Sequence, residues 1–224
     1  MVNQKYSDPY FDLTDRQHCL TPLSIVKEAN ADGPPDPTPT VAPPPLPCPP
    51  SVKRVGDVFD DPHFFVDGPS AKDIRQGGDG DCWFLSALMA ICNLDLIVSL
   101  VSKICVAWDQ DVGVYGFVLY RDGEWTSVIV DDKLYLRKPD YEDADEQTRG
   151  EWEDNRNRIN SEEEYRKEFQ SNSRALYYAQ STNSNETWVP LIEKAFAKAH
   201  GDYGVIESGS VGQVVIVNLK SGIN

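Results

Sequence analysis

The densest run of apolar residues lies in residues 82–92, which read CWFLSALMAIC. Ser86 is the one clearly polar residue in this run, so a helix formed by it is apolar on nearly every side. Helices of this kind are typically buried inside a domain. We therefore predict a buried helix over 82–92 and a second, shorter helix over 95–104. Polar residues at four positions between 85 and 101 make this region too polar to span a bilayer.

Two runs rich in β-forming residues follow, at 115–120 and at 125–130. Asp122 and Gly123 lie between them, and an Asp-Gly pair between two such runs is a strong signal for a β-hairpin. A third short strand is expected at 134–136.

Further along the chain, apolar residues recur with helical spacing in the segment 186–200. They occupy positions i, i+3, i+4, i+7, i+8 and i+11, namely Trp188, Leu191, Ile192, Ala195, Phe196 and Ala199. This spacing predicts a helix with one buried face. Pro190 is tolerated in the first turn of a helix, and Gly201 is suited to cap the C-terminal end. Helices combined with a small antiparallel hairpin indicate an α+β fold.

Proline divides the chain near residue 50. Ten of the sixteen prolines lie in 34–50, and because proline fixes φ and has no amide donor, neither a helix nor a central strand is expected there. Residues 1–50 are therefore predicted to be a disordered N-terminal tail and proline-rich linker, with at most one short helix over 22–29. Residues 51–224 are predicted to form the packed domain.

Charge restricts the expected partners. The 224 residues include 36 acidic and 21 basic side chains, which gives a net charge of −15. This excess of negative charge repels phosphate groups, so it excludes nucleic acids and anionic membrane surfaces as expected partners. Thirteen acidic and six basic residues lie between positions 131 and 164. We predict that residues 139–170 form a solvated acidic insertion.

The five cysteines are widely spaced and include no CxxC pair, and the N-terminus has no apolar core of the kind a signal peptide needs. They are therefore expected to be reduced thiols of a cytoplasmic protein.

The segment 76–85 reads QGGDGDCWFL and joins a glycine-rich loop to the start of the predicted buried helix. Cys82 is the first residue of that helix, where the partial positive charge and the free amide groups favour a thiolate. The thiolate is the nucleophilic form of cysteine. The backbone amide of Cys82 and the side-chain amide of Gln76 are both candidates to donate to an oxyanion.

The simpler interpretation is that Cys82 is a small buried apolar residue, as a cysteine that opens an apolar helix usually is. The glycine loop and Gln76 favour a nucleophile instead. Asp79 and Asp81 oppose a thiolate by like charge, so a cation or a histidine is needed to offset them.

The segment 76–85 resembles the active-site signature of the calpains, Q-G-x-x-G-D-C-W-F-L. These are intracellular, calcium-dependent cysteine endopeptidases of the papain-like superfamily. The resemblance extends over roughly residues 51–208. The acidic insertion is longer than in most animal calpains, as in fungal-type members, and the tail at 209–224 departs from the family pattern.

This resemblance implies a papain-like fold represented by its first, helical subdomain, with protein substrates. It implies that Cys82 is the nucleophile and Gln76 an oxyanion-hole donor.

The resemblance also implies that this subdomain binds one Ca²⁺. The implied ligands are the backbone carbonyls of Val66 and Gly68 and the carboxylates of Asp73 and Glu186. Calcium prefers about six to eight oxygen ligands, and water molecules can complete such a set.

A papain-like thiolate needs an imidazole that an asparagine orients. The chain contains His18, His63 and His200. His200 follows Cys82 in the order of the superfamily, but it ends a predicted helix, where the helix dipole favours a cation for structural reasons. In calpains the catalytic histidine and asparagine lie in a second subdomain. We therefore expect this chain to be an N-terminal fragment that lacks them and is inactive alone.

Two other functions stay open. The missing histidine and asparagine motivate a noncatalytic calcium-binding or protein-interaction module derived from the calpain fold. A transglutaminase is the third hypothesis, because its nucleophile also lies in a Cys-Trp pair. Asp81 and the Gln76 loop argue against it.

Overall fold

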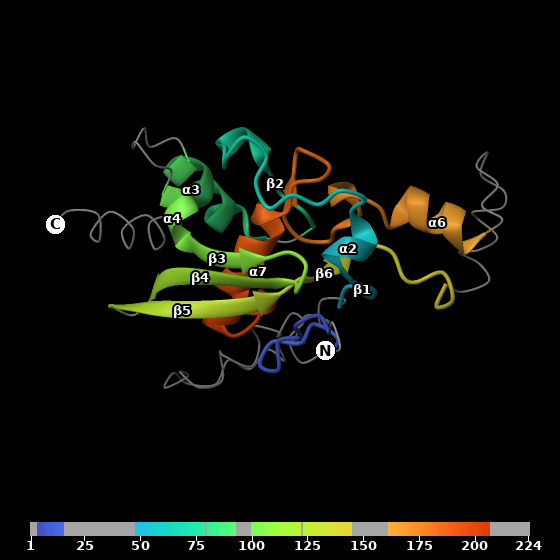
Figure 1. Cartoon of the computed structure of the whole chain (residues 1–224), viewed down its shortest axis with the longest axis horizontal. Coiled ribbons are helices and arrows are strands. Elements are labelled where there is room, and N and C mark those ends of the chain that lie inside the picture. The colour runs from blue at the N-terminus through green and yellow to red at the C-terminus, as the bar shows by residue number, and fades with distance from the viewer. Residues whose placement is uncertain are drawn as a thin grey trace, which may run out of the picture.

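A computed structural model of the protein describes residues 4–15, 48–78, 80–92, 100–121, 123–144 and 161–206. Within these ranges, helices combine with short antiparallel strands (Figure 1), which confirms the α+β class. The elements in chain order are β1 (Ser51–Arg54), α2 (Val55–Val58), η3 (Ala71–Asp73), β2 (Ile74–Arg75), α3 (Cys82–Cys92), α4 (Leu100–Ile104), β3 (Cys105–Asp109), β4 (Val114–Arg121), β5 (Glu124–Asp131), β6 (Lys133–Leu136), α6 (Glu162–Phe169), η4 (Ser173–Ala175), β7 (Gln180–Ser181), α7 (Trp188–His200) and α8 (Tyr203–Ile206).

The predicted hairpin forms as β4 and β5, and β3 joins it in an antiparallel sheet of order β3-β4-β5. The pairing runs from Val114 opposite Asp131 to Arg121 opposite Glu124. Gly123 in the turn has a φ of +92°, which glycine adopts without steric cost. The turn residues therefore identified the hairpin correctly.

The strand expected at 134–136 also forms, as β6, but it pairs with β1 instead of extending the hairpin. The chain changes direction at Asp131 and Asp132, whose side chains are buried. A carboxylate oxygen of Asp131 accepts a hydrogen bond from the amide of Lys133 at 3.1 Å, which is a local side-chain turn. This turn directs β6 away from the three-stranded sheet.

The predicted buried helix over 82–92 is present as α3 with the same bounds. Phe84 and Leu88 are buried on it. The ring of Phe84 stacks on that of Phe196 in α7, with ring centroids 4.3 Å apart. α3 is therefore anchored to the central helix of the domain.

The central helix α7 lies behind the three-stranded sheet (Figure 1) and contacts both β4 and β5. It contains Pro190 in its first turn and is capped by Gly201, whose φ is +119°, as expected. The helix begins at Trp188, two residues later than predicted, because the segment before it pairs with His63.

Residues 4–15 pack against the domain, although the sequence placed them in a disordered tail. Phe11 and Leu13 are each 1% exposed and join an apolar cluster with aromatic residues of β6 and α8. The buried carboxylate of Asp8 accepts a hydrogen bond from the ammonium group of Lys198 at 2.6 Å. Two apolar anchors in a polar context gave too weak a pattern to predict this packing.

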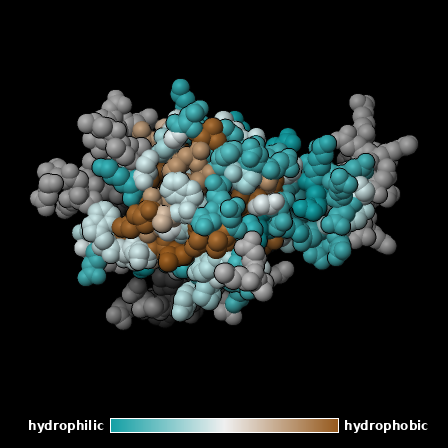
Figure 2. Space-filling view, in the orientation of Figure 1, coloured by the Kyte–Doolittle hydropathy of each residue, from teal (hydrophilic) through white to brown (hydrophobic). Residues whose placement is uncertain are grey.

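The acidic region is described in part, and α6 lies within it at one end of the molecule, where Figure 2 shows mainly hydrophilic atoms. Tyr165 is fully buried in a small cluster with Ala144, Tyr141 and Phe169. The described part of this region therefore has an apolar cluster of its own, separate from the main core.

Several predictions fall outside the described residues: the helix over 22–29, the first part of the helix over 95–104, and the segment 209–224. Within the described ranges, no helix is long and apolar enough to cross a membrane.

The expectation of five reduced cysteines is wrong at Cys48, which is disulfide-bonded, whereas Cys82, Cys92 and Cys105 are free. The spacing of cysteines along the sequence does not predict which thiols the fold brings close together.

Candidate active site

Cys82 lies at the exposed end of a buried helix. It is the first residue of α3 and is exposed, whereas Cys92 is half-buried and Cys105 is buried. The carbonyl oxygen of Asp81 accepts a hydrogen bond from the amide of Phe84 at 2.9 Å, which begins the helix at this point. The thiol therefore lies at the positive end of the helix dipole, and its exposure contradicts the simpler interpretation as a buried apolar residue.

The loop before Cys82 lies against the backbone of Tyr177 and Tyr178. The amide of Gly78 donates a hydrogen bond to the carbonyl oxygen of Tyr177 at 2.7 Å. A Cβ atom on Gly77 would lie 1.9 Å from the carbonyl oxygen of Tyr178, so the loop and this backbone approach too closely for a side chain. These two contacts hold the loop in place.

Gln76 is exposed and directly follows β2. The strand is held by pairing of Ile74 with Ser181 in β7. Gln76 and Cys82 thus lie at the two ends of one short loop, and both residues are exposed. Their catalytic roles stay predictions.

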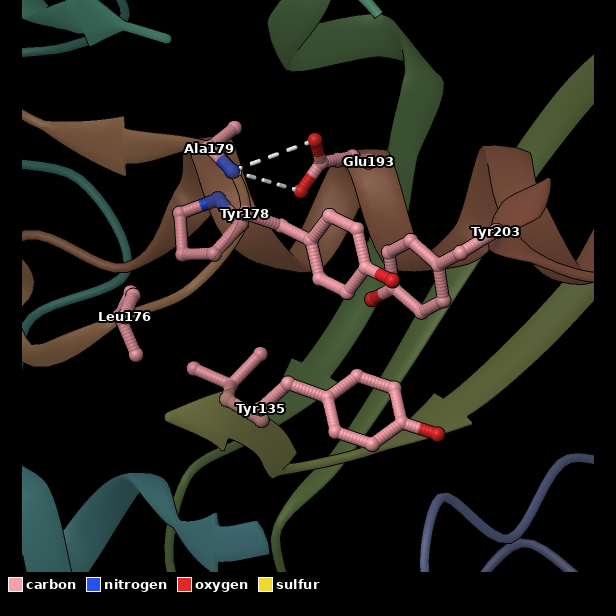
Figure 3. Close-up of a pocket in the computed structure, with 8 residues that line it drawn as sticks. Tyr135, Leu176, Tyr178, Ala179, Glu193 and Tyr203 are labelled. Carbon is pink, nitrogen blue, oxygen red and sulfur yellow. Dashed lines mark hydrogen bonds between the residues drawn. The ribbon is translucent and has the colours of Figure 1, made fainter. Parts of the chain in front are cut away.

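Two carboxyl groups meet where this loop enters α3. Asp81 and Glu193 are both fully buried, and the Glu193 side chain lies close enough to Asp81 to lower its pKa, although neither carboxylate oxygen of Asp81 has a hydrogen-bond partner of normal geometry among the described residues. The amide of Ala179 donates to both carboxylate oxygens of Glu193, at 3.2 and 3.0 Å (Figure 3). Burial raises the pKa of Asp81, and the contact with Glu193 offsets this effect only in part.

A narrow cavity with room for about one water molecule lies beside Glu193 (Figure 3). The rings of Tyr178 and Tyr203 stack at its edge, with centroids 4.0 Å apart and an interplanar angle of 14°. Tyr135 of β6 packs edge-on against both rings. Burial raises the pKa of both Tyr135 and Tyr203, so both phenols stay neutral at physiological pH.

The two described histidines make contacts within their own regions. The Nδ1 atom of His200 lies 2.8 Å from the carbonyl oxygen of Phe196, and the two rings pack with centroids 4.2 Å apart. The Nε2 atom of His63 lies 3.1 Å from a carboxylate oxygen of Asp61. His18 lies outside the described residues.

The candidate calcium ligands Val66 and Glu186 lie side by side. A parallel β-bridge joins His63 to Glu186, and the amide of Val66 donates to the Oε1 atom of Glu186 at 2.9 Å. Glu186 is fully buried. Within the described part of the chain, its Oε2 atom has no hydrogen-bond partner of normal geometry, although the indole of Trp188 lies close to it.

Asp73 is the second carboxylate of the predicted metal site. Its carbonyl oxygen accepts the amide of Thr182 at 2.7 Å, and its side chain accepts the amide of Ser70 at 2.8 Å. Burial raises the pKa of Glu186, the charge of Asp73 raises it further, and burial also raises the pKa of Asp73. The two carboxylates therefore lie close enough to repel each other.

Gly68 follows Val66 in a turn and has a φ of +84°. Across the described ranges, no group of three or more histidine, cysteine, aspartate or glutamate side chains is placed to hold a metal ion. The predicted set has two carboxylates and two backbone carbonyls, so it does not require such a group.

The sequence did not predict that Glu193 is buried. The helical pattern identified the buried face of α7 from its apolar residues, and an acidic residue among them gave no signal of burial. Asp81 was recognised as a charge close to the thiol, but not as a fully buried one. The local spacing of residues does not predict a contact between two segments that lie 112 residues apart in the chain.

Comparison with known proteins gives a consistent result. The family described as calpain family cysteine protease matches residues 48–158 and 164–221. Calpain-5 of Mus musculus is 30% identical over 182 residues, which cover 77% of this chain and 22% of that protein. Calpain-B of Drosophila melanogaster is 34% identical over 162 residues, which cover 70% and 13%. The calpain-1 catalytic subunit of Bos taurus is 29% identical over 162 residues, which cover 72% and 18%. The chain thus spans 13–22% of the length of these relatives.

Proposed function

The chain belongs to the calpain family of cysteine proteases, and we propose that it forms the nucleophile-bearing part of a calpain-like cysteine endopeptidase. The observation that carries this proposal is the exposed Cys82 thiol at the N-terminus of a buried helix, behind a loop that backbone contacts hold in place. In this proposal the described domain is the first subdomain of a papain-like core, and its substrates are proteins inside the cell.

The proposed reaction begins with attack of the Cys82 thiolate on the carbonyl carbon of a peptide bond. A bond forms between Sγ and this carbon while the C–N bond breaks, and the amine leaves with a proton from an imidazolium. The amide groups of Cys82 and Gln76 donate hydrogen bonds to the oxygen that becomes negative. Water then hydrolyses the thioester, which restores the thiol and releases the acid product.

We assign the imidazole and its asparagine to a second protease subdomain. The contacts of His200 with Phe196 and of His63 with Asp61 support this assignment, because they engage both described histidines elsewhere. In this proposal the described domain contributes the nucleophile, and peptidase activity requires both subdomains.

Calcium is the proposed ligand of the site formed by Glu186 and Asp73. Two buried or half-buried carboxylates with raised pKa values favour a cation, and the unpaired Oε2 atom of Glu186 is available to it. The backbone carbonyls of Val66 and Gly68 are the other proposed ligands. A bound cation offsets the repulsion between the carboxylates and ties the segment before the Cys82 loop to the start of α7.

The protease proposal is tested by labelling the full chain with an epoxide-type inhibitor of cysteine proteases, together with a second subdomain from a calpain relative. We expect labelling that depends on calcium, is lost in Cys82→Ala, and is kept in the control Cys92→Ala. A chain that stays unlabelled under these conditions contradicts the proposal. If that chain nevertheless binds calcium, the noncatalytic calcium-binding module becomes the better description.

The calcium proposal is tested by calorimetry on the full chain. We expect Glu186→Gln and Asp73→Asn each to weaken binding at least about tenfold, since each removes one charged ligand. Asp67→Asn is the matched control, because Asp67 is exposed in the same turn. Affinity should increase with pH as Glu186 and Asp73 lose their protons. Equal affinity in all four proteins would remove the site.

A further inference from the structure

The buried contact between Asp81 and Glu193 places an acid directly before the candidate nucleophile and against a second acid. Both side chains are fully buried. Within the described residues, the oxygens of Asp81 meet no N–H or O–H donor other than the backbone amide of Asp81 itself. Two ionised carboxylates cannot form a hydrogen bond with each other, whereas one carboxylic acid and one carboxylate can.

The packing of α3 on α7 explains why these two residues meet. Phe84 lies three residues after Asp81, and Phe196 lies three residues after Glu193. The stacked rings of Phe84 and Phe196 fix the two helices at that level, so Asp81, directly before α3, is brought close to Glu193, one turn before Phe196 on α7. The packing of α3 on α7 therefore determines the contact between the two acids.

We propose that Asp81 and Glu193 share one proton and act as a positioning pair that fastens the Cys82 loop to α7 and to the backbone at Ala179. Glu193 accepts the amide of Ala179, and the adjacent Tyr177–Tyr178 backbone holds Gly77 and Gly78. Glu193 thus links α7 to the backbone segment that contacts the loop. This inference rests on the proposed role of Cys82 as the nucleophile.

Neutral phenols face the pair from the elements packed around it. Tyr203 of α8 interacts electrostatically with both acids, and it lies with Tyr178 and Tyr135 at the cavity beside Glu193 (Figure 3). Burial favours the protonated form of Asp81. With one proton between them, the two carboxyl groups carry a single negative charge near the thiol instead of two.

This arrangement has a chemical consequence for Cys82. The sequence raised the difficulty that Asp81 opposes a thiolate by like charge, and a shared proton halves the charge that the pair presents. The carboxyl group that holds the proton donates its O–H to the other, so the position of the loop depends on that proton being kept.

The proton is tested first by measuring the unfolding equilibrium of the full chain as a function of pH. The variants are Glu193→Gln and Asp81→Asn, in which an amide N–H replaces the shared proton. The unfolded chain ionises both acids above about pH 4, while the folded chain keeps one proton. Wild type therefore loses stability relative to either variant as the pH rises above the unfolded pKa of about 4, by up to about tenfold in the unfolding constant per pH unit. Glu168→Gln, an exposed acid on α6, is the control and should follow wild type.

The charge is tested by the pH dependence of Cys82 alkylation with iodoacetamide. Either single variant keeps one negative charge and should leave the alkylation midpoint unchanged. The double variant Asp81→Asn/Glu193→Gln removes that charge and should move the midpoint to lower pH. If a single variant moves the alkylation midpoint by half as much as the double variant does, both acids are ionised in wild type. That result would overturn the proposal.

The positioning role is tested by hydrogen exchange at the amides of Gly78 and Ala179. Glu193→Ala should lose protection at both, and Glu193→Gln should restore it, because glutamine still accepts from Ala179 and donates to Asp81. If Glu193→Ala does not fold, the pH dependence of the unfolding equilibrium, compared between Glu193→Gln and wild type, still tests the proposal. Parallel unfolding profiles for wild type, Glu193→Gln and Glu168→Gln overturn the proposal. An inert Cys82 with divergent profiles overturns the proposed function and leaves the proton-sharing pair standing.

Discussion

At the scale of single residues, the loop before Cys82 depends on a contact that leaves no space for a methyl group. Gly77 lies so close to Tyr178 that an added Cβ would overlap its carbonyl oxygen. Gly77→Ala should therefore displace the loop and lower the free energy of unfolding by about 1–3 kcal/mol. It should also change the rate of Cys82 alkylation. Chemical denaturation and timed alkylation measure the two effects.

The neighbouring glycine provides the control for this substitution. A Cβ on Gly78 would have its nearest neighbour 3.4 Å away, which is a tolerable contact. Gly78→Ala should cost clearly less than Gly77→Ala. Equal effects from both substitutions would show that the close approach at Gly77 does not hold the loop.

The free thiols should differ strongly in reactivity. Burial raises the pKa of Cys92 to about 11 and that of Cys105 to about 12, so both stay protonated at pH 8. Cys82 is exposed. Of these three, we expect only Cys82 to react quickly with iodoacetamide in the folded chain, as measured by peptide mass mapping. Comparable rates at all three under native conditions would contradict the described burial.

The candidate site residues that the sequence predicts are those that carry a local signature. Cys82 and Gln76 are predicted because a glycine loop before an apolar helix is a local pattern, and their catalytic roles stay predictions. Glu193 was not found, since its importance comes from contacts with Asp81 and Ala179 that only the folded chain makes. The disulfide at Cys48 was missed for the same reason.

At the scale of elements, the N-terminal segment 4–15 behaves as part of the domain. Phe11 is 1% exposed, whereas its neighbour Tyr10 is 82% exposed. Phe11→Ala should lower the free energy of unfolding by about 3–5 kcal/mol, as expected for a buried phenylalanine. Tyr10→Ala, the matched control, should change it by less than about 0.5 kcal/mol. Thermal or denaturant unfolding distinguishes the two, and a small effect at Phe11 would show that the segment is dispensable.

The long elements were predictable, and the pairings between short ones were not. α3, α7 and the β4–β5 hairpin have periodic or turn patterns that extend over eight or more residues. β2 and β7 have two residues each, which is too short for any periodicity. The pairing of β1 with β6 joins segments about 80 residues apart, and no local pattern specifies that partner.

At the scale of the whole molecule, α6 and its cluster should be the least stable described part. Tyr165 packs with Ala144, Tyr141 and Phe169 in a cluster that is separate from the main core. We expect amide hydrogens of α6 to exchange faster than those of α7, because α6 can open without disturbing the main core. Tyr165→Ala should increase exchange in α6 and leave α7 unchanged. A loss of protection in both helices would contradict this independence.

The meeting of Asp81 with Glu193 also has a consequence for biosynthesis. Glu193 lies 111 residues after Cys82, so a ribosome has made Cys82 well before it makes the helix that contains Glu193. At about 5–20 residues per second, this interval is roughly 5–20 s. During this interval the nascent chain carries Cys82 and the apolar segment of α3 without the helix α7 on which they pack. The apolar surface of this segment is then most exposed to aggregation and most in need of a chaperone.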